Sequence, residues 1–456
     1  MSDLIDDDGR GFPVSFDVIV IGAGACGLVA ALSAHDAGAS VVVLERDAIP
    51  AGSTALSSGM ITACGTALQK AAGIDDDTPE LFAADIQSKA GGKADPELLA
   101  AICAQSGPTI DWLVSTHHLD LVLVPGAPYP GHSRQRTHAP PSQTGTELMA
   151  DLQRAVADKE VDIVTNAHAE SLFRIDDRIT GVAFRRPDGG VEHVGCQALV
   201  LASSGFGGDR ELVGEFVPDM AEALYFGHAG NTGDAVRWGQ ALGAACRHMG
   251  SFQGHGSVAT PHAITVSWAL MKGGGILVNS EGNRFADEMA GASEVAAAVC
   301  SQPGGTVWAV IGNGPHERAL RFPEYRQLAD LGAIKDGGTA GELASACHLP
   351  EAALAATLAA AYEMAGGDES QADGLQPPYH AIRVTGALLQ TQGGLAINNE
   401  AQVCRDDGAP LPNLFAGGGA AQGISGVDGA GYLSCNGLLS AVTLGHIAGR
   451  QAADRC

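Results

Sequence analysis

Basic residues are scarce in this sequence. Only 26 lysines and arginines stand against 52 aspartates and glutamates, so the formal net charge is −26 at pH 7. A nucleic-acid-binding surface needs clustered cations to neutralise phosphates, and an anionic membrane surface attracts cations for the same reason. The composition therefore predicts no nucleic-acid partner and disfavours a membrane surface.

Long apolar runs, signal-peptide features and paired cysteines are also missing. No stretch of about 18 consecutive apolar residues is present, so we expect no membrane span. Residues 1–10 carry four aspartates where a secretory signal needs positive charge and an apolar segment, so we expect a cytoplasmic protein. The 10 cysteines form no CxxC pair, so we expect neither a disulfide framework nor a metal site.

Glycine, by contrast, is abundant, with 62 of 456 residues. The glycines have no three-residue period, which excludes a collagen-like chain. With 45% hydrophobic and 17% charged residues, the chain is not disordered either, and its length predicts two or three domains. Glycines that cluster as these do indicate close approach of the backbone to a flat or anionic ligand.

A dinucleotide-binding pattern lies near the N-terminus. Residues 17–21 form an apolar run of strand length and are followed by the segment GAGACG at 22–27, which fits the pattern GxGxxG. A helical pattern follows, and a second apolar run at 41–44 ends on Glu45. Strand, glycine turn, helix, strand and acid in this order predict a dinucleotide site.

Each part of that pattern has a physical role. Gly22 permits the tight turn, Gly24 lets backbone N–H groups reach a pyrophosphate, and Gly27 lets helix and strand pack closely. Glu45 accepts hydrogen bonds from both ribose hydroxyls and disfavours a 2′-phosphate, so we do not expect NADP.

Further glycine-rich segments favour FAD over NAD. They lie at residues 52–60, 198–208 and 412–431, and a last helical pattern spans 437–445. An NAD site needs mainly the first motif, whereas glycine turns at both ends of the chain converge on one extended ligand. The candidate cofactor-binding residues are Gly22, Gly24, Ala25, Cys26, Gly27, Glu45, Arg46, Ser53, Thr54, Ser58, Gly59, Ala202, Ser203, Gly205, Gly418, Gly419, Asn436 and Leu438.

Three later segments match known motifs. Residues 199–208 are similar to "VVLATGGFGG", residues 414–419 to "LFAAGE" with Gly419 in place of the glutamate, and residues 276–285 to "ILVN-x-EG-x-RF". With these motifs in the same order, the chain from about residue 17 to 453 resembles the flavoprotein family of fumarate reductases and succinate dehydrogenases. That family includes 3-ketosteroid dehydrogenases.

The resemblance implies an α/β fold: a Rossmann-type FAD-binding domain with a parallel, doubly wound sheet, interrupted by an inserted α+β capping domain. We expect the FAD-binding domain at 14–249 and 386–456 and the capping domain at 250–385, with the active site between them. Succinate dehydrogenases tether FAD to a histidine; Ser53 stands at that position, so the resemblance implies non-covalent FAD.

The active-site positions depart from the fumarate-reducing members. Where those members carry a proton relay and cationic clamps, this chain has uncharged side chains, namely Trp268, Met271, Ala292, Gln390 and Tyr432. A dicarboxylate needs two cationic clamps, because an unpaired buried carboxylate costs several kcal/mol, and its reduction needs a proton donor. We therefore expect neither a fumarate reductase nor a succinate dehydrogenase, but an enzyme for a neutral, more apolar substrate.

The resemblance to ketosteroid dehydrogenases makes Tyr432 the first catalytic candidate, because a phenol can hold a carbonyl or, as phenolate, take a proton. A packing residue beside the flavin is the alternative. His255, which keeps the family's histidine, either contacts the carbonyl or is structural. Tyr129 and Arg136 belong to a cationic loop at 129–138, which either clamps a carboxylate or the FAD pyrophosphate, or is solvated.

These features together predict an FAD-dependent enzyme that desaturates a cyclic ketone or steroid-like substrate beside its carbonyl, by hydride transfer to flavin N5. No haem, iron–sulfur or FMN segment is present, so the electrons must pass to an external acceptor. One alternative is the reverse reaction, an enone or enoate reductase acting on a keto or unsaturated acid. A second is a flavin-binding protein without turnover; a homo-oligomer is compatible with each of them.

Overall fold

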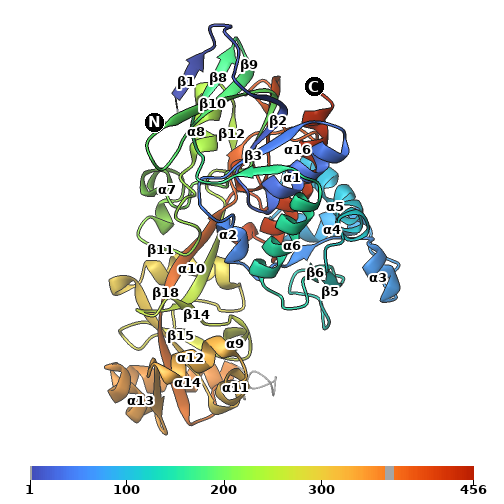
Figure 1. Ribbon diagram of the computed structural model, residues 1–456. Coiled ribbons are helices and arrows are strands. Elements are labelled where there is room, and N and C mark those ends of the chain that lie inside the picture. The colour runs from blue at the N-terminus through green and yellow to red at the C-terminus, as the bar shows by residue number, and fades with distance from the viewer. Residues whose placement is uncertain (1–2, 365–373) are drawn as a thin grey trace. The chain divides into compact units, whose positions relative to one another are not determined.

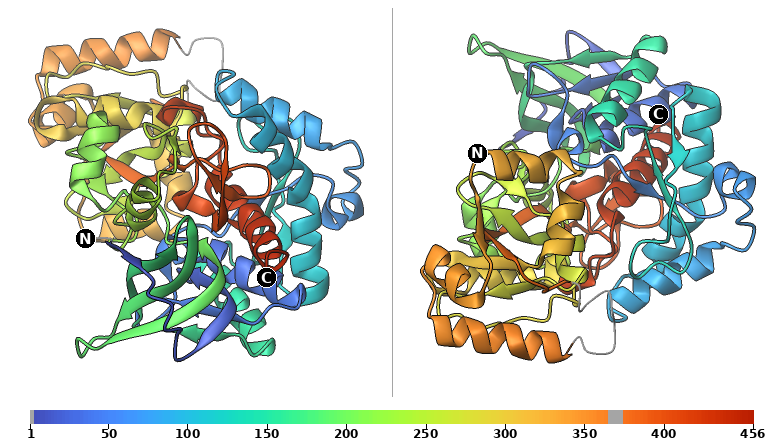
Figure 2. Two further views of the ribbon diagram at one scale, coloured as in Figure 1. Left: turned by 90° about the horizontal axis from the view of Figure 1, so that it is seen from above. Right: turned by 90° about the horizontal axis from the view of Figure 1, so that it is seen from below.

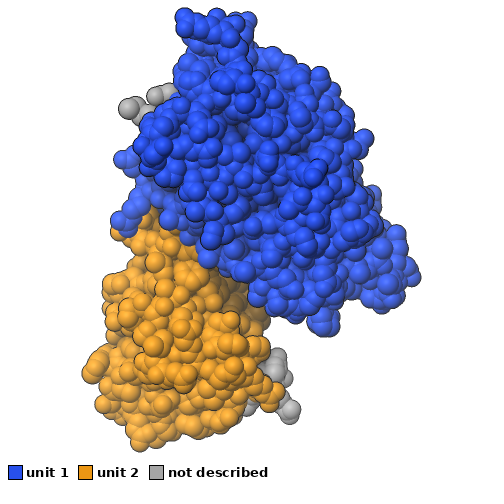
Figure 3. Space-filling model, viewed as in Figure 1, with its two compact units in different colours: residues 1–216, 227–252, 390–456 blue, residues 217–226, 253–389 orange. Residues whose placement is uncertain are grey.

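The structure is a computed structural model that describes residues 3–364 and 374–456, with its elements shown in Figure 1 and from two other directions in Figure 2. The chain forms two compact units (Figure 3). Unit 1 contains residues 1–216, 227–252 and 390–456, and unit 2 contains residues 217–226 and 253–389. Unit 2 is therefore an insertion into unit 1. It includes the short stretch 217–226, which lies within the expected first FAD-binding segment at 14–249.

A parallel sheet forms the centre of unit 1. β10 pairs in parallel with β2 and β21, β2 with β3, and β3 with β7, so the expected parallel sheet is confirmed. Strands that are buried on both faces read as continuous apolar runs, as residues 18–21 and 41–44 do. The strands are β2 (Ser15–Ile21), β3 (Val41–Leu44), β7 (Asp162–Val164), β10 (Val191–Leu201) and β21 (Pro410–Ala416).

The same sheet has an antiparallel part. The first half of β10 pairs with β9 (Arg178–Arg185), which pairs with β8 (His168–Ile175). β1 (Asp3–Asp6) adds in parallel to β8, and β20 (Gln402–Cys404) adds antiparallel to β21. Two small sheets complete the strands of unit 1, and they contain β4 (Ile61–Thr62), β5 (Val122–Leu123), β6 (Thr137–Ala139), β12 (Cys246–Arg247) and β19 (Gly394–Leu395).

The C-terminal helix lies against helices from the start of the chain, as Figure 2 shows. α16 (Asn436–Ala453) packs on α1 (Ala25–Asp36) and on α5 (Pro96–His117). A Cβ added to Gly445 would lie 2.5 Å from the Cys26 carbonyl oxygen, so α1 and α16 approach more closely than a larger residue allows. The remaining helices of unit 1 are α2 (Gly52–Ala55), α3 (Ala67–Ala71), α4 (Pro79–Lys89), α6 (Gly145–Asp158), α7 (Arg210–Phe216) and α8 (Asp234–Ala241).

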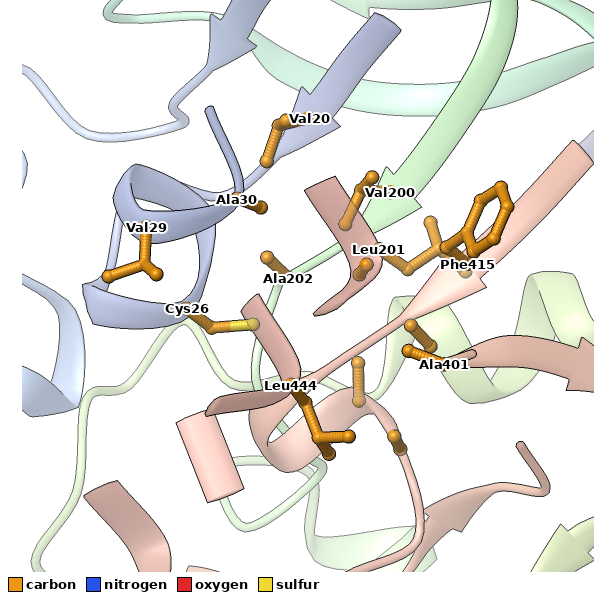
Figure 4. Close-up of a cluster of buried hydrophobic side chains, with 14 of the residues drawn as sticks. Val20, Cys26, Val29, Ala30, Val200, Leu201, Ala202, Ala401, Phe415 and Leu444 are labelled. Atoms are coloured by element: carbon orange, nitrogen blue, oxygen red, sulfur yellow. The ribbon is translucent and has the colours of Figure 1, made fainter. Parts of the chain in front are cut away.

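Figure 4 shows part of the core that these elements bury together. Val20, Val200 and Phe415 come from three neighbouring strands of the parallel sheet, and each is fully buried. Leu444 of α16 and Cys26 of α1 lie in the same cluster. Both ends of the chain therefore contribute to one core, and separating them would expose large apolar surface.

Unit 2 is built on a second sheet. β18 (Tyr379–Thr391) lies at its centre and pairs antiparallel with β16 and β17 and in parallel with β11. The other strands of this sheet are β11 (Leu224–Tyr225), β13 (Phe252–Ala259), β14 (Ile264–Thr265), β15 (Ile276–Val278), β16 (Thr306–Ile311) and β17 (Ile334–Gly337). The helices are α9 (Ala269–Lys272), α10 (Ala292–Cys300), α11 (Asn313–Ala319), α12 (Pro323–Asp330), α13 (Ala340–Cys347) and α14 (Glu351–Met364). This mixture of helices and strands has the α+β character expected of the inserted part.

None of the helices in the two described ranges is both long enough and apolar enough to cross a membrane.

Candidate active site

Three glycine turns, far apart in the sequence, meet at one end of the parallel sheet. A Cβ added to Gly22 would lie 2.6 Å from the Ala202 carbonyl oxygen, and one added to Gly419 would lie 2.7 Å from the Gly205 nitrogen. Gly27 packs on the first turn, since its Cβ would lie 1.8 Å from the Gly22 carbonyl oxygen. These approaches are possible only without side chains, and they bring the segments at 22–27, 202–208 and 417–419 into one place.

The start of α1 has the form of a pyrophosphate site. The N-cap of α1 is Gly24, which has no side chain of its own to cap the helix, and a Cβ added there would meet only the Thr54 hydroxyl, at 3.6 Å. That hydroxyl accepts a hydrogen bond from the Ala25 N–H at 3.1 Å. A helix N-terminus with an open glycine at its N-cap and a neighbouring hydroxyl suits an anionic diphosphate.

Glu45 lies at the end of β3, beside this turn. One carboxylate oxygen accepts the Ala23 N–H at 2.7 Å, and the other accepts the Asp47 N–H at 2.9 Å. Each oxygen keeps a further lone pair for a ribose hydroxyl. The two backbone bonds hold the carboxylate where the adenosine end of a dinucleotide would lie.

Several buried polar atoms have no hydrogen-bond partner among the described residues. They include the Ser203 hydroxyl, the Asn436 side-chain oxygen and the Ser440 hydroxyl. Asn436 and Ser440 belong to α16, whose N-cap residue, Cys435, makes no side-chain cap bond. A buried polar group without a partner is costly, so these atoms fit a site that a polar cofactor completes.

Several other candidate cofactor-binding residues have the following environments. The Ser53 hydroxyl accepts hydrogen bonds from the His228 N–H at 3.1 Å and from the Asn231 amide at 2.9 Å. The Arg46 guanidinium lies against Gly230, where a Cβ would be only 1.4 Å away. Ser58 is exposed, Leu438 is half-buried, and Gly59 has a φ of +65°.

Cys26 and Gly418 lie at the contact between the first and last segments. The Cys26 Sγ would be 2.7 Å from a Cβ on Gly417, and the Cys26 Cβ 3.3 Å from one on Gly418. Burial raises the pKa of the Cys26 thiol to about 12, so it is a neutral packing group.

Tyr432 lies just before α16 and is half-buried. Its hydroxyl oxygen accepts the Gly437 N–H at 3.4 Å and is hydrogen-bonded to the side chain of Gln390. Burial raises the pKa of this phenol, more than the hydrogen bonds around it lower it. Tyr432 is therefore a neutral phenol at physiological pH, and the pair that it forms with Gln390 carries no charge.

The loop with Tyr129 lies beside the Tyr432 segment. His132 Nε2 is 3.1 Å from the Ser434 carbonyl oxygen, and a Cβ on Gly131 would lie 2.6 Å from the Leu433 side chain. The Tyr129 hydroxyl donates to the Met60 sulfur at 3.3 Å. Burial, with the nearby Cys435 thiol as a smaller cause, raises the pKa of Tyr129; the Cys435 thiol also raises that of Tyr432.

Arg136 occupies a different environment from that of a ligand clamp. It is 1% exposed, and its guanidinium bonds the Asp77 carboxylate at 2.7 and 3.0 Å and also pairs with Asp85. The guanidinium carbon lies 4.5 Å from the centre of the Phe82 ring. These contacts belong to a buried structural ion-pair cluster, and no pattern in the sequence points to the two aspartates that take part in it.

His255 belongs to unit 2. Its Nε2 lies 3.2 Å from the Val266 carbonyl oxygen, so Nε2 carries the hydrogen and Nδ1 is the nitrogen able to accept a proton. Burial lowers the pKa of His255 to about 4, so the ring is neutral at pH 7 and offers no positive charge. Its neighbour Trp268, with ring centres 6.1 Å apart, donates its indole N–H to the Glu288 carbonyl oxygen.

Arg284, which ends the segment 276–285 together with Phe285, forms an ion pair with Glu288 inside unit 2. Arg284 binds the Glu288 carboxylate through two nitrogens, and Glu288 also accepts the Leu277 N–H at 2.7 Å. Among the residues that the structure covers, no group of three or more histidine, cysteine, aspartate or glutamate side chains could hold a metal ion.

The glycine turns at 22–27, 202–208 and 417–419, which together form a glycine cradle at the start of α1, define a dinucleotide-binding flavoprotein. Comparison with known families agrees, because the model of the FAD binding domain family matches residues 17–438. The chain belongs to this family of FAD-dependent oxidoreductases, and FAD is its cofactor.

Two relatives illustrate the range of the matches. The chain is 30% identical over 458 residues to an NADH:fumarate oxidoreductase of Klebsiella pneumoniae, a match that covers 97% of this chain and 48% of that protein. It is 25% identical to a 4-oxocyclohexanecarboxylate 2-dehydrogenase of Sinomonas cyclohexanicum, over 97% of this chain and 93% of that protein. The chain thus spans about half the length of the first relative and nearly all of the second.

Two solved structures have the same fold. The open form of a flavocytochrome c3 fumarate reductase superimposes with a TM-score of 0.83 at 28% identity, covering 98% of this chain and 79% of that one. A 3-ketosteroid-Δ4-(5α)-dehydrogenase of Rhodococcus jostii in complex with 4-androstene-3,17-dione superimposes with a TM-score of 0.79 at 24% identity, covering 99% and 100%. The second likeness concerns the fold alone.

Proposed function

We propose that this protein desaturates a neutral cyclic ketone or steroid-like compound next to its carbonyl group. The observation that carries the proposal is the uncharged pair of Tyr432 and Gln390 in front of α16. A dicarboxylate would bury an unpaired negative charge at this pair, at a cost of several kcal/mol. A neutral carbonyl needs only a hydrogen-bond donor, which the Tyr432 phenol supplies.

In the proposed reaction the ketone gives up a proton from its α-carbon and a hydride from its β-carbon, and a C=C bond forms. FAD, which the glycine cradle would hold without a covalent bond, would supply the two-electron acceptor for that hydride. Donation of the Tyr432 hydrogen bond to the carbonyl oxygen stabilises the negative charge that develops there as the α-proton leaves. The electrons then pass to an external acceptor.

Tyr129 is the candidate for accepting the α-proton, because it lies in the same unit as Tyr432 and both phenols are close to the Cys435 thiol. It can take that proton only as a phenolate, which burial disfavours by raising its pKa. His255 belongs to unit 2 and its pKa of about 4 makes it a weak base, so we give it no step in this proposal. We assign Arg136 no part in the chemistry, because its guanidinium is already paired.

The similarity to reductases supports a second candidate, the reverse reaction on an enone or an unsaturated acid. The relative from Klebsiella pneumoniae is named for fumarate reduction, and the one from Sinomonas cyclohexanicum for dehydrogenation of a cyclic keto acid. The uncharged pair of Tyr432 and Gln390 favours dehydrogenation over this reverse reaction, because the substrate named for the dehydrogenase carries a ring ketone.

Anaerobic mixing of the FAD-loaded enzyme with a panel of compounds tests the proposal. The panel contains cyclohexanone, 4-oxocyclohexanecarboxylate, 4-androstene-3,17-dione and succinate. We expect a ketone, but not succinate, to bleach the flavin absorbance. Oxidation of the pre-reduced flavin by 2-cyclohexen-1-one or by fumarate would favour the reductase, and no reaction in either direction would leave a flavin-binding protein without turnover.

A tyrosine substitution tests the site. Tyr432→Phe removes the donor and is expected to slow flavin reduction by about 10²-fold or more. Tyr379→Phe is the matched control, because Tyr379 lies in unit 2 and has no role in the proposal. Equal rates for the wild type and Tyr432→Phe would remove Tyr432 from the mechanism.

A further inference from the structure

Gln390 comes unusually close to the start of α16. It is the second-last residue of β18 (Tyr379–Thr391), and a Cβ added to Gly437 would lie 2.2 Å from its Nε2 and 3.1 Å from its Oε1. Because α16 begins at Asn436, Gly437 belongs to the first turn of that helix. Any side chain at Gly437 would displace the Gln390 amide, so the glycine makes the approach possible.

The Tyr432 hydroxyl oxygen is surrounded by hydrogen-bond donors. The Gly437 N–H donates at 3.4 Å, and the backbone of Cys435 makes a further hydrogen bond to the same oxygen. A backbone N–H can only donate. The Gln390 side chain is hydrogen-bonded to the same oxygen, and its Nε2, which can only donate, is the amide atom nearer to a Cβ on Gly437.

This arrangement leaves the hydrogen of the phenol for another acceptor. A phenol has one hydrogen to give, and neither the Gly437 N–H, which donates to the Tyr432 oxygen at 3.4 Å, nor the Gln390 Nε2 beside Gly437 can accept it. The acceptor that remains is a ligand atom, such as the carbonyl oxygen of the proposed substrate.

We propose that Gln390 is a positioning residue, whose amide, seated against Gly437, holds the Tyr432 oxygen so that the phenol hydrogen points to the substrate carbonyl. The inference rests on the proposed function for the identity of the ligand and extends it, because it makes recognition depend on a neutral donor amide. An acceptor in place of that amide would take the phenol hydrogen for itself.

Substitutions at Gln390 and Gly437 test whether the donor amide and its position against the helix are both needed. Gln390→Met keeps the length of the side chain and removes the donor, whereas Gln390→Glu replaces the donor with an acceptor. Gly437→Ala leaves the amide intact but pushes it away from the helix. Gln402→Met is the control, since Gln402 is a buried glutamine that bonds the Leu411 and Pro412 carbonyl oxygens.

The first readout needs no substrate. In FAD-loaded protein carrying tyrosine labelled with ¹³C at the ring carbon that bears the hydroxyl, Tyr432→Phe identifies the signal of Tyr432. We expect Gln390→Met and Gly437→Ala to shift this signal and Gln402→Met to leave it in place. A signal that stays unchanged in both Gln390→Met and Gly437→Ala would overturn the inference.

The second readout uses 2-cyclohexen-1-one as a probe of the carbonyl site and follows the flavin absorbance. We expect its dissociation constant to rise about tenfold in Gln390→Met and further in Gln390→Glu. Binding within twofold of the wild type in both variants would overturn the inference. If no panel compound reacts with the wild-type flavin, the proposed function fails, while the tyrosine signal still decides whether Gln390 positions the phenol.

Discussion

Removing the Arg136 guanidinium should destabilise unit 1 strongly and leave the preference among substrates unchanged. Arg136 is 1% exposed and Asp77 is 5% exposed, and the two are joined through two guanidinium nitrogens, with Nε and Nη2 2.7 to 3.0 Å from the carboxylate oxygens. Arg136→Met keeps most of the packing on Phe82 but leaves Asp77 as a buried charge without its partner. Breaking a buried ion pair on one side costs about 3 to 5 kcal/mol.

The double substitution Arg136→Met with Asp77→Leu provides the control. Because both charges are removed, the uncompensated charge disappears, and most of the lost stability should return. Asp85 keeps the Ser133 hydroxyl and N–H, each at 2.8 Å, as partners. Asp85 is partly exposed to solvent, so it adds little to the cost.

Urea unfolding with saturating FAD, followed by circular dichroism, measures these changes. We expect the midpoint to fall clearly in Arg136→Met and to recover in the double variant. The reasoning would be refuted if Arg136→Met unfolded like the wild type within about 1 kcal/mol. It would also be refuted if this variant lost carboxylate-bearing ketones from its substrate range, because the arginine would then be a clamp.

Three further predictions concern the cofactor and the fold. Gly27→Ala places a Cβ 1.8 Å from the Gly22 carbonyl oxygen and should abolish retention of FAD on gel filtration, whereas Gly214→Ala, in open space within α7, should add about 0.5 to 1 kcal/mol of stability. FAD should leave the protein on acid precipitation, because Ser53 cannot form the histidyl tether; yellow precipitate would contradict this. Stability should fall as the pH drops from 6.5 toward 4, because burial lowers the pKa of His138 and of His446 to about 4. The unfolded state then binds more protons, at a cost of roughly 1 to 3 kcal/mol per histidine, and a flat thermal midpoint over this range would refute the assignment.

The dinucleotide cradle was readable from sequence because its determinants are local. The strand at 17–21, the glycines at 22–27 and the helix after them form one continuous segment, and the structure has β2 and α1 there. Each residue type in this segment is needed for a local backbone geometry, so the motif can be recognised from one sequence. The parallel sheet follows from the same apolar runs.

The ionised loop at 129–138 shows where such reading fails. Its arginines and histidines suggest a cationic surface for a ligand, yet the Arg136 charge is taken up by Asp77 and Asp85, which lie 59 and 51 residues away in the chain. Spacing in sequence carries no information about such partners, because the helices between them decide which side chains meet.

The sequence by itself determined the cofactor class and the parallel sheet, since these depend on residue types at positions within short motifs. Only the tertiary structure decided which of the named side chains are free to act. Arg136 is neutralised by a buried pair, while Tyr432 meets Gln390 because Gly437 lets β18 and α16 approach. Contacts between distant segments are set by the packing of the whole unit, and no single segment of the sequence determines that packing.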